Sequence, residues 1–538
     1  MSVIPRPDRM KINNLETYIE DGSIKVPKFQ RDFVWEVKKS AELLDSILKG
    51  SPIGTIIFLK TTEKLQSIKD IGGFELKKQK KTGETSYILD GQQRITSLYA
   101  CLKGFTIKGN DYSNIFVYLD AADDEQIVFT EIDELDKKKI ISFKEIYNMN
   151  ITAVNKKYKT AKLLNRIQEL NSRLKDYELS IIEVENAEID LATDIFTRIN
   201  VSGKPLSVFE IMCAKIYDEK NKFDLADKVK DLLDDWSACD YETISTTTIL
   251  QCVAMCLKKS CKNKIILKLK REDFVNSWDS IVKSMNAAIE FFQKAFGIAV
   301  SKLLPYDALL VPFTYFFYLN KNKTPSKEIT IKYLKDYFWR CVFNQRFTEG
   351  VTGKLQVDVQ NVIEVIYKGG TPTYSEGVDI STRFLEQKGE FSTGSAIAKG
   401  ILCLLSSKTP LSFTDGSKVK ISNDWLLQSN SKNYHHFFPK KYMKNKQHRE
   451  DKVNHIANIT ILDSETNQKI KANAPSDYIQ WYKTAQNFNS IMKSHLIGDI
   501  DEFGINKNNY DTFFKKRLEL FNQELQKLII CKEGFDIF

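Results

Sequence analysis

The sequence lacks the features that mark several large protein classes. Its longest apolar run, Ala308–Leu319, has 12 residues and contains Pro312, short of the roughly 18 that a membrane-spanning helix needs. The N-terminal residues are polar and proline-containing, without the apolar core of a signal peptide, so we expect a cytoplasmic protein with no membrane partner. No GxxxxGK[ST] motif is present, which excludes a nucleotide site of the Walker type.

Cysteine and histidine are both minor components of the sequence, and their positions lead to different interpretations. The nine cysteines are scattered, and only Cys252, Cys256 and Cys261 lie close together, with no second ligand pair nearby for zinc. We therefore interpret them as small core side chains in a reducing compartment. The five histidines are absent from the first 434 residues, and four of them fall between His435 and His455. Such bunching favours chemistry over a scatter of core histidines.

The composition is that of an ordinary soluble globular protein, with 538 residues, 42% hydrophobic and 28% charged. The net charge is +9, and residues 431–472 hold nine basic against four acidic side chains, a local excess of five. Phosphate backbones are the usual partners of such a patch, although a solvated lysine-rich face would look the same. The predicted DNA contacts in and beside this patch are Lys440, Lys441, Lys444, Lys469 and Lys471.

Periodicity predicts an α+β multidomain chain. Residues 1–217 alternate strand-like and helix-like segments: amphipathic Val37–Gly50 predicts a helix, Gly54–Lys60 a strand, and Ser86–Asp90 a strand followed by a helix over Gln92–Gly104. Residues 218–390 are helical in pattern and rich in aromatic stripes that are typical of a core. Residues 391–538 carry the histidines. We predict an N-terminal α/β domain, a helical middle domain and a C-terminal domain with these boundaries.

The segment around His435 and His436 predicts a strand that leads into a turn at Pro439. Downstream, Asn458–Leu462 predicts a second strand, Asp463–Thr466 a turn, and Asn467 the start of a helix. Strand, strand, helix is the order of a ββα-metal nuclease site. Imidazole can deprotonate an attacking water near neutral pH, and a divalent cation held by one or two protein groups can neutralise charge on phosphate oxygens.

The turn at Asp90–Arg94 offers a second candidate site. Asp90 ends a predicted strand, Gly91 permits a tight turn, and Gln92, Gln93 and Arg94 open a helix whose free N–H groups attract an anion. A capped helix with an exposed arginine is the structural alternative. Two further segments, FQRDFVW with Arg31 and FTRINVSGKPLS with Arg198, accompany this motif in the first 217 residues.

These motifs together resemble the GmrSD-like family of modification-dependent restriction proteins. VPKFQRDFVW, ILDGQQRITSL and FTRINVSGKPLS resemble its N-terminal domain, which has a ParB/sulfiredoxin-like fold and is associated with nucleotide binding and hydrolysis. The resemblance implies that Asp90, Gly91, Gln92, Gln93 and Arg94 bind or turn over a nucleoside triphosphate (GTP, UTP or ATP), with Arg31 and Arg198 at its phosphates.

HHFFPK and N-I-T-I-L-x4-N resemble the HNH-type nuclease domain that closes the same proteins. The resemblance implies that His436 is the general base, that His435 and Asn467 are metal ligands, and that Asn458 braces the loop between the strands. Many HNH sites carry a carboxylate where His435 stands, and imidazole is a softer ligand for Mg²⁺, so Mn²⁺ or Ni²⁺ could also serve. His448 and His455 match nothing essential, and phosphate contact or surface exposure suits both.

The resemblance thus implies a nucleotide-dependent, metal-dependent endonuclease that cuts modified or invading double-stranded DNA in bacterial defence. Two other functions stay open on the sequence. One is a nucleotide-responsive protein that binds nucleic acid without cutting it, and the other is an HNH nuclease directed at RNA. A structural zinc held by four histidines is disfavoured because closed zinc sites prefer cysteine. No segment specifies the oligomeric state, and a homo-oligomer is compatible with the sequence.

Overall fold

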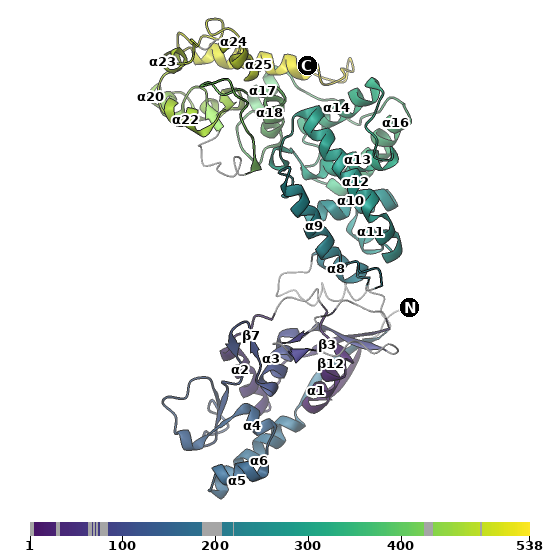
Figure 1. Ribbon diagram of the computed structural model, residues 1–538, viewed down its shortest axis with the longest axis vertical. Coiled ribbons are helices and arrows are strands. Elements are labelled where there is room, and N and C mark those ends of the chain that lie inside the picture. The colour runs from purple at the N-terminus through teal and green to yellow at the C-terminus, as the bar shows by residue number, and fades with distance from the viewer. Residues whose placement is uncertain are drawn as a thin grey trace. The chain divides into compact units, whose positions relative to one another are not determined.

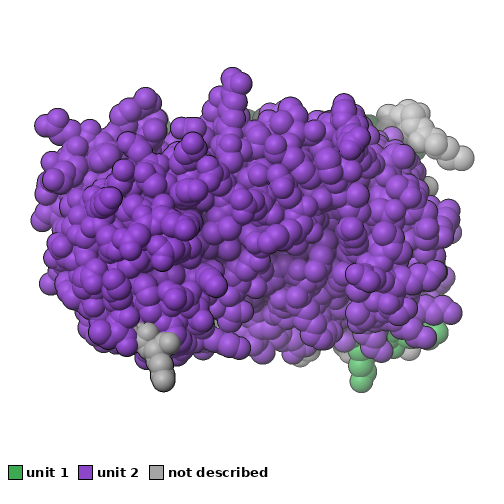
Figure 2. All heavy atoms as spheres, turned by 90° about the horizontal axis from the view of Figure 1, so that it is seen from above, with its two compact units in different colours: residues 1–222 green, residues 223–538 purple. Residues whose placement is uncertain are grey.

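The computed structural model describes residues 5–27, 33–62, 67, 70–71, 74–75, 84–185, 207–218, 220–423, 434–484 and 487–538. The chain forms two compact units, residues 1–222 and 223–538 (Figure 1). The first unit ends close to the boundary predicted at residue 217. The boundary predicted near residue 390 does not divide compact units, since the helical middle and the histidine-bearing segment form one body (Figure 2).

A mixed five-stranded sheet organises unit 1. Its order is β1-β12-β3-β6-β2, with antiparallel pairing of β1 to β12 and β3 to β6, and parallel pairing of β12 to β3 and β2 to β6. The strands are β1 (Arg6–Lys11), β2 (Ile24–Lys25), β3 (Ile56–Thr61), β6 (Thr85–Asp90) and β12 (Glu178–Glu185). The register shifts between Ile57 and Phe58, opposite the end of β6, so the ladder becomes irregular where Asp90 leaves the sheet.

The described residues of unit 1 also form helices. They are α1 (Ile12–Glu20), α2 (Val37–Leu48), α3 (Gln92–Lys103), α4 (Phe143–Tyr147), α5 (Ile151–Lys157), α6 (Ala161–Asp176) and α8 (Val208–Ile216). In α2, Leu44, Ile47 and Leu48 are fully buried, at the three- and four-residue spacing of one helix face. The predicted helices Val37–Gly50 and Gln92–Gly104 and the strands beside them are thus confirmed.

Smaller strand pairs complete unit 1. A three-stranded sheet has the order β10-β9-β11, formed by β9 (Phe116–Tyr118), β10 (Val128–Phe129) and β11 (Ile140–Ser142). Two short antiparallel pairs are β4 (Asp70–Ile71) with β5 (Phe74–Glu75), and β7 (Thr106–Ile107) with β8 (Asn110–Asp111).

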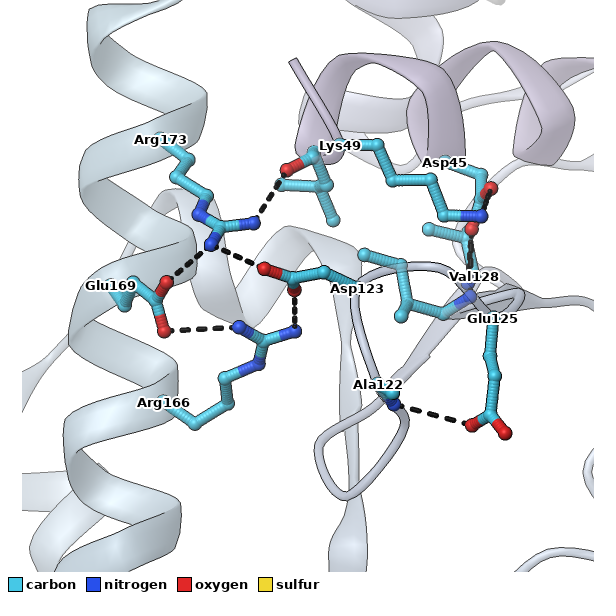
Figure 3. A network of polar contacts seen from close by, with 11 residues as sticks. Asp45, Lys49, Ala122, Asp123, Glu125, Val128, Arg166, Glu169 and Arg173 are labelled. Atoms are coloured by element: carbon cyan, nitrogen blue, oxygen red, sulfur yellow. Dashed lines mark hydrogen bonds and ion pairs between the residues drawn. The ribbon is translucent and has the colours of Figure 1, made fainter. Parts of the chain in front are cut away.

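A charged network fastens the loop after β9 to α6 and α2 (Figure 3). Asp123 pairs with Arg166 and Arg173, and Glu169 bridges the same two guanidinium groups. Arg173 also donates to the carbonyl of Leu48 at the end of α2. The two arginines hold the pKa of Asp123 down to about 2. Because most of these groups reach solvent, the network fixes the loop's position more than it adds stability.

Unit 2 begins with a helical segment whose interior is aromatic. Its helices are α9 (Leu225–Ser237), α10 (Thr246–Lys258), α11 (Asn263–Leu267), α12 (Arg271–Phe296), α13 (Leu310–Leu319), α14 (Glu328–Phe343), α15 (Val351–Asp358), the π-turn η4 (Val359–Ile363), α16 (Glu364–Tyr367), α17 (Thr382–Lys388) and α18 (Ala396–Ser407). Phe292, Phe296 and Phe338 are buried against one another, with the rings of Phe296 and Phe338 stacked at 4.0 Å. The interpretation of these stripes as core is confirmed.

The histidine-bearing segment is joined to these helices by buried contacts, which explains why the two pack as one compact unit. Gly400 of α18 lies so close to Val342 of α14 that a Cβ there would sit 2.6 Å from a valine methyl. Near the chain end, Asp536 receives two hydrogen bonds from Arg340, each 2.7 Å long. Arg340 is buried and also pairs with Asp336. These contacts bind the chain end to α14.

Further elements of unit 2 include a pair of strands. They are β13 (Tyr434–His436), α20 (Lys440–Asn445), α21 (Glu450–Val453), η5 (Ile456–Asn458), β14 (Ile459–Ile461), α22 (Ser464–Ile470), α23 (Pro475–Gln480), α24 (Phe488–Ser494) and α25 (Tyr510–Gln526). In the part of the chain that the structure describes, no helix has both the length and the apolar character to cross a membrane.

Candidate nuclease site

The site is built on the antiparallel pair β13 and β14. His435 lies opposite Thr460, and His436 lies opposite Ile459. Because neighbouring side chains on a strand face opposite ways, the two imidazoles meet different partners. The prediction that His435 and His436 lie on a strand with different surroundings is confirmed.

His435 and Asn467 are brought together as the sequence predicts. His435 Nδ1 lies 2.9 Å from Asn467 Oδ1, which reaches across from α22 to the strand. His435 is 2% exposed, and its ring packs against that of Tyr478, 6.0 Å away between centroids. Its Nε2 is buried and has no hydrogen-bond partner among the described residues.

Asn467 does not open its helix, so that prediction is wrong. Asp463 caps α22 by accepting a hydrogen bond from the backbone N–H of Thr466, and the helix begins at Ser464. The residues predicted as a separate turn therefore form the cap and first turn, because the Asp463 carboxylate satisfies N–H groups that would otherwise lack a partner. Asn467 stands at the end of that first turn.

His436 is held by a residue that the sequence analysis missed. His436 Nε2 lies 3.1 Å from Asn454 Oδ1, and Asn454 Nδ2 donates to the carbonyl of Phe391 at 3.0 Å. The backbone N–H of Phe391 donates in turn to the carbonyl of Asn454. Asn454 is one of many asparagines in the sequence, and only its contact with Phe391, 63 positions away, distinguishes it.

Asn458 ends the short helical turn η5, immediately before β14, and is fully buried. Its Nδ2 donates to the carbonyls of Phe438 and Val453, and its Oδ1 accepts from the N–H of Phe438. One side chain thus joins both ends of the connection between the strands, which is the arrangement a brace would need.

Burial lowers the pKa of both paired imidazoles. The pKa of His435 falls to about 4 and that of His436 to about 3, chiefly because burial disfavours the charged ring. The ammonium group of Lys440 lowers the pKa of His436 further. Both rings are therefore neutral at pH 7, as a metal ligand or a general base must be before it acts.

The other histidines do not belong to this site. His455 is 3% exposed, so the expectation of surface exposure or phosphate contact is wrong for it: its Nε2 bonds to the carbonyl of Glu386, and its Nδ1 accepts from the N–H of Ala457. His495 is fully buried and bonds to the carbonyl of Leu411. His448 is half-buried and packs on the ring of Tyr510.

A buried arginine lies behind β14. Arg517 of α25 is fully buried and donates hydrogen bonds to the carbonyls of Ala457, Ile459 and His495. No carboxylate pairs with it among the described residues, and burial lowers its pKa to about 9. Three carbonyl dipoles and the rings of Phe513 and Phe521 stabilise the charge in place of an anion. Arg517 thus fixes the strand that pairs with His436.

The predicted DNA-contacting lysines are all exposed. Lys440, Lys441 and Lys444 lie on α20, directly after Pro439, while Lys469 and Lys471 lie at the end of α22. Lys469 forms an exposed ion pair with Glu465 at 2.9 Å. The positive charge of Lys440 is one cause of the lowered pKa of His436, so this lysine lies near that imidazole.

The turn at Asp90–Arg94 has the predicted shape. Gly91 has a φ of +90°, and Cβ at this position would lie 2.9 Å from the Ile56 side chain, so the turn favours glycine. α3 begins directly after it, at Gln92. The turn therefore leads directly into a helix N-terminus, where the helix dipole favours negative charge.

Arg94 is committed to the protein's own backbone. Its guanidinium donates to the carbonyls of Ile53 and Thr55 at 2.8 and 2.9 Å, and it pairs with Asp90 at 3.1 Å. Gln93 Oε1 accepts from the N–H of Val34, and Gln92 is buried. Arg94 therefore joins the residues before β3 to the end of β6. Arg31 and Arg198 lie outside the described residues.

His435 and Asn467 supply one imidazole nitrogen and one amide oxygen that could serve as ligands of a divalent cation. The 2.9 Å between His435 Nδ1 and Asn467 Oδ1 is the length of a hydrogen bond, and it is also compatible with two neighbouring ligands of an octahedral ion, which lie about 3 Å apart. Within the described ranges, no cluster of three or more His, Cys, Asp or Glu side chains could hold a metal. Such an ion would therefore take its other ligands from water and the substrate phosphate.

Comparison with known proteins identifies the chain. Residues 12–217 match the model of the N-terminal domain of GmrSD restriction endonucleases, and residues 382–525 match that of their C-terminal domain. The protein is thus a DNA endonuclease of restriction defence. It belongs to the GmrSD restriction endonuclease family, and the two matched segments contain the Asp90–Arg94 turn and the His435–Asn467 pair respectively.

A similar protein is MJ0686 of Methanocaldococcus jannaschii, which is described as uncharacterized. It is 23% identical over 581 aligned residues, covering 96% of this chain and 97% of that protein. The similarity therefore extends over both units.

Proposed function

We propose that the β13–β14–α22 segment is an HNH-type, metal-dependent nuclease site. The observation that carries this proposal is the pair of asparagine contacts to adjacent imidazoles, His435 to Asn467 and His436 to Asn454. Each imidazole is neutral and fixed in orientation, yet each meets a different partner. This arrangement supports a role for His435 as a metal ligand and for His436 as the general base.

In this mechanism His436 accepts the proton of the attacking water. The Phe391 carbonyl can only accept a hydrogen bond, so the Asn454 amide nitrogen must face it and the amide oxygen must face His436. His436 Nε2 therefore carries the ring proton, which leaves Nδ1 with the lone pair that a general base needs.

His435 and Asn467 would hold a divalent cation, Mg²⁺ or Mn²⁺ with Ni²⁺ as a further candidate. When bound, such an ion neutralises charge on the phosphate and leaving oxygens. The exposed lysines of α20 and α22 would bind phosphates of double-stranded DNA on either side of the cut. Asn458 would keep the connection between the strands in place.

We further propose that the Asp90–Arg94 turn binds a nucleoside triphosphate. Its support is the glycine-containing turn that opens α3 beside the Asp90 carboxylate, together with the match to the family's N-terminal domain. In this proposal a phosphate lies at the N-terminal end of α3, while Arg94 holds the turn in shape through its bonds to the carbonyls of Ile53 and Thr55. Asp90→Ala should then lower nucleotide turnover, and unchanged binding and turnover would remove this part of the proposal.

The decisive experiment is digestion of modified and unmodified phage DNA with Mg²⁺, Mn²⁺ or Ni²⁺, with and without each nucleotide. Nicking should require a metal and should fall at least 100-fold in His436→Ala, with DNA binding intact. His448→Ala is the matched control and should cut normally, because that ring makes no contact with the site. Salt-sensitive binding without products would favour a non-cutting binder, and faster cleavage of RNA would favour an RNA-directed nuclease.

A further inference from the structure

Trp481 is a large apolar side chain left in solvent beside the candidate nuclease site. It is 51% exposed, whereas the aromatic residues that line the two strands are buried. Leaving an indole in water forgoes the free energy of burying it, so an exposed tryptophan commonly marks a contact surface. Its surroundings indicate which kind of partner it meets.

Trp481 is attached to the strand that carries the two imidazoles. It follows α23 directly, and its N–H donates to the carbonyl of Tyr478. Tyr478 is fully buried, donates its hydroxyl to the carbonyl of Phe437, and packs its ring on His435. Trp481 therefore lies at the C-terminal end of α23, and Tyr478 of the same helix packs against the candidate catalytic strand.

Exposed cations lie on the same segments. Lys471 and Lys483 are exposed on either side of α23. Lys469 is also exposed, at the end of α22, and the Tyr482 ring lies 6.3 Å from the indole. Asp477 and Glu465 are the exposed acids here, and Glu465 is already paired with Lys469. The charge of this surface suits a polyanion.

The backbone at Lys471 adds an independent observation. Lys471 has φ +50° and ψ −109°, and the N–H of Asn473 donates to the carbonyl of Ile470 across it. This is the first central position of a type II′ turn, where glycine is strongly preferred. A lysine at this position costs conformational energy, and such strain tends to occur at functional sites.

We propose that Trp481 stacks on an unpaired base of DNA bound at the nuclease site, while Lys471 and Lys483 contact its phosphates. Aromatic side chains bind single-stranded bases by stacking regardless of sequence, and basic neighbours follow the backbone. This inference rests on the proposed nuclease function. It adds that the substrate is engaged through a base outside the double helix.

The test is binding of a DNA duplex that carries a short single-stranded gap with one 2-aminopurine, measured without divalent metal. Trp481→Ala should weaken binding roughly 10- to 100-fold, the size of one lost stacking contact, and should abolish the fluorescence change of the probe. Trp481→Phe should restore most of the affinity. Tyr367→Ala, which removes an exposed aromatic elsewhere in unit 2, is the matched control and should bind like the wild type.

Salt dependence separates stacking from charge. Trp481→Ala should leave the slope of log affinity against log salt unchanged, whereas Lys471→Ala should reduce it by about one. Wild-type affinity in a Trp481→Ala variant with an unchanged melting temperature would overturn the proposal. The proposal would also be overturned if Trp481→Ala converted a dimer into a monomer and kept its DNA affinity, because the indole would then be shown to contact a second copy of the chain in place of DNA. If the wild-type protein bound this DNA but did not cut it when metal was supplied, the nuclease assignment would be refuted and the binding result would still stand.

Discussion

Asn454 fixes which nitrogen of His436 carries a proton. Its amide oxygen lies 3.1 Å from His436 Nε2 because its amide nitrogen is held by the carbonyl of Phe391. Phe391 and Asn454 are thus joined next to the candidate base. Beside them, Glu390 and His455 form an antiparallel β-bridge. The orientation of one imidazole depends on a segment far away in the sequence.

Replacing Asn454 by alanine should slow DNA cleavage about 10- to 100-fold, the range found when a group that orients a functional histidine is removed. The ring would lose its acceptor and populate other orientations and tautomers. Cleavage rates at saturating DNA measure the effect, with DNA affinity measured in parallel.

Asn489→Ala is the control for this variant, because Asn489 is exposed on α24. It should cut at the wild-type rate. Equal rates for Asn454→Ala and the wild type would show that Asn454 does not position His436.

Arg94→Lys should destabilise unit 1 by about 2–4 kcal/mol. Lysine keeps the charge but cannot donate simultaneously to the carbonyls of Ile53 and Thr55 and to Asp90. Chemical denaturation followed by a probe in unit 1 measures the change. Arg9→Lys is the control, since the Arg9 pair with Glu178 is exposed and should contribute less than about 1 kcal/mol. Equal small losses in both variants would contradict a structural role for Arg94.

Unit 2 should lose stability as the pH falls below about 6.5. Burial lowers the pKa of His455 to about 4, and its Nδ1 accepts a hydrogen bond from Ala457 that a protonated ring cannot accept. Between that folded value and the ordinary value near 6.5, the unfolded chain binds more protons. The contribution is therefore complete above about pH 6.5 and is lost as the pH falls towards 4.

Denaturation of unit 2 at several pH values between 7.5 and 4.5 measures this effect. His455→Gln should reduce the dependence of unfolding free energy on pH, because glutamine does not titrate, while the part that comes from the lowered pKa values of His435, His436 and His495 should remain. Asn489→Gln, on the exposed face of α24, is the control and should retain the wild-type slope, because neither amide titrates. A His455→Gln slope equal to that of the wild type would refute the assignment.

Lys471→Gly should raise stability while it weakens DNA binding. Glycine adopts a φ of +50° without the steric cost that lysine pays, so we expect a gain of about 1 kcal/mol in unfolding free energy. The salt slope of DNA binding should fall by about one as a phosphate contact is lost. A stabilised variant with unchanged binding would show that Lys471 is not at the DNA interface.

Local patterns in the sequence specify much of the secondary structure. The spacing of apolar residues in Val37–Leu48 and the order strand, glycine, helix at Ser86–Lys103 predict elements that the structure contains. Both depend on neighbouring residues alone, through helix amphipathicity and the φ freedom of Gly91. Asn467 lies inside α22 and not at its start, because the Asp463 carboxylate caps the helix ahead of it.

The sequence by itself determined the family, the strand under His435 and His436, and the basic surroundings of that strand. Only the tertiary structure decided that Asn454 and Phe391 hold His436, that Arg517 supports β14, and that residues 223–538 are one unit. These features depend on hydrogen bonds and packing between segments tens of residues apart. Periodicity reports on the face of one helix or strand, whereas such contacts exist only once several elements share a core.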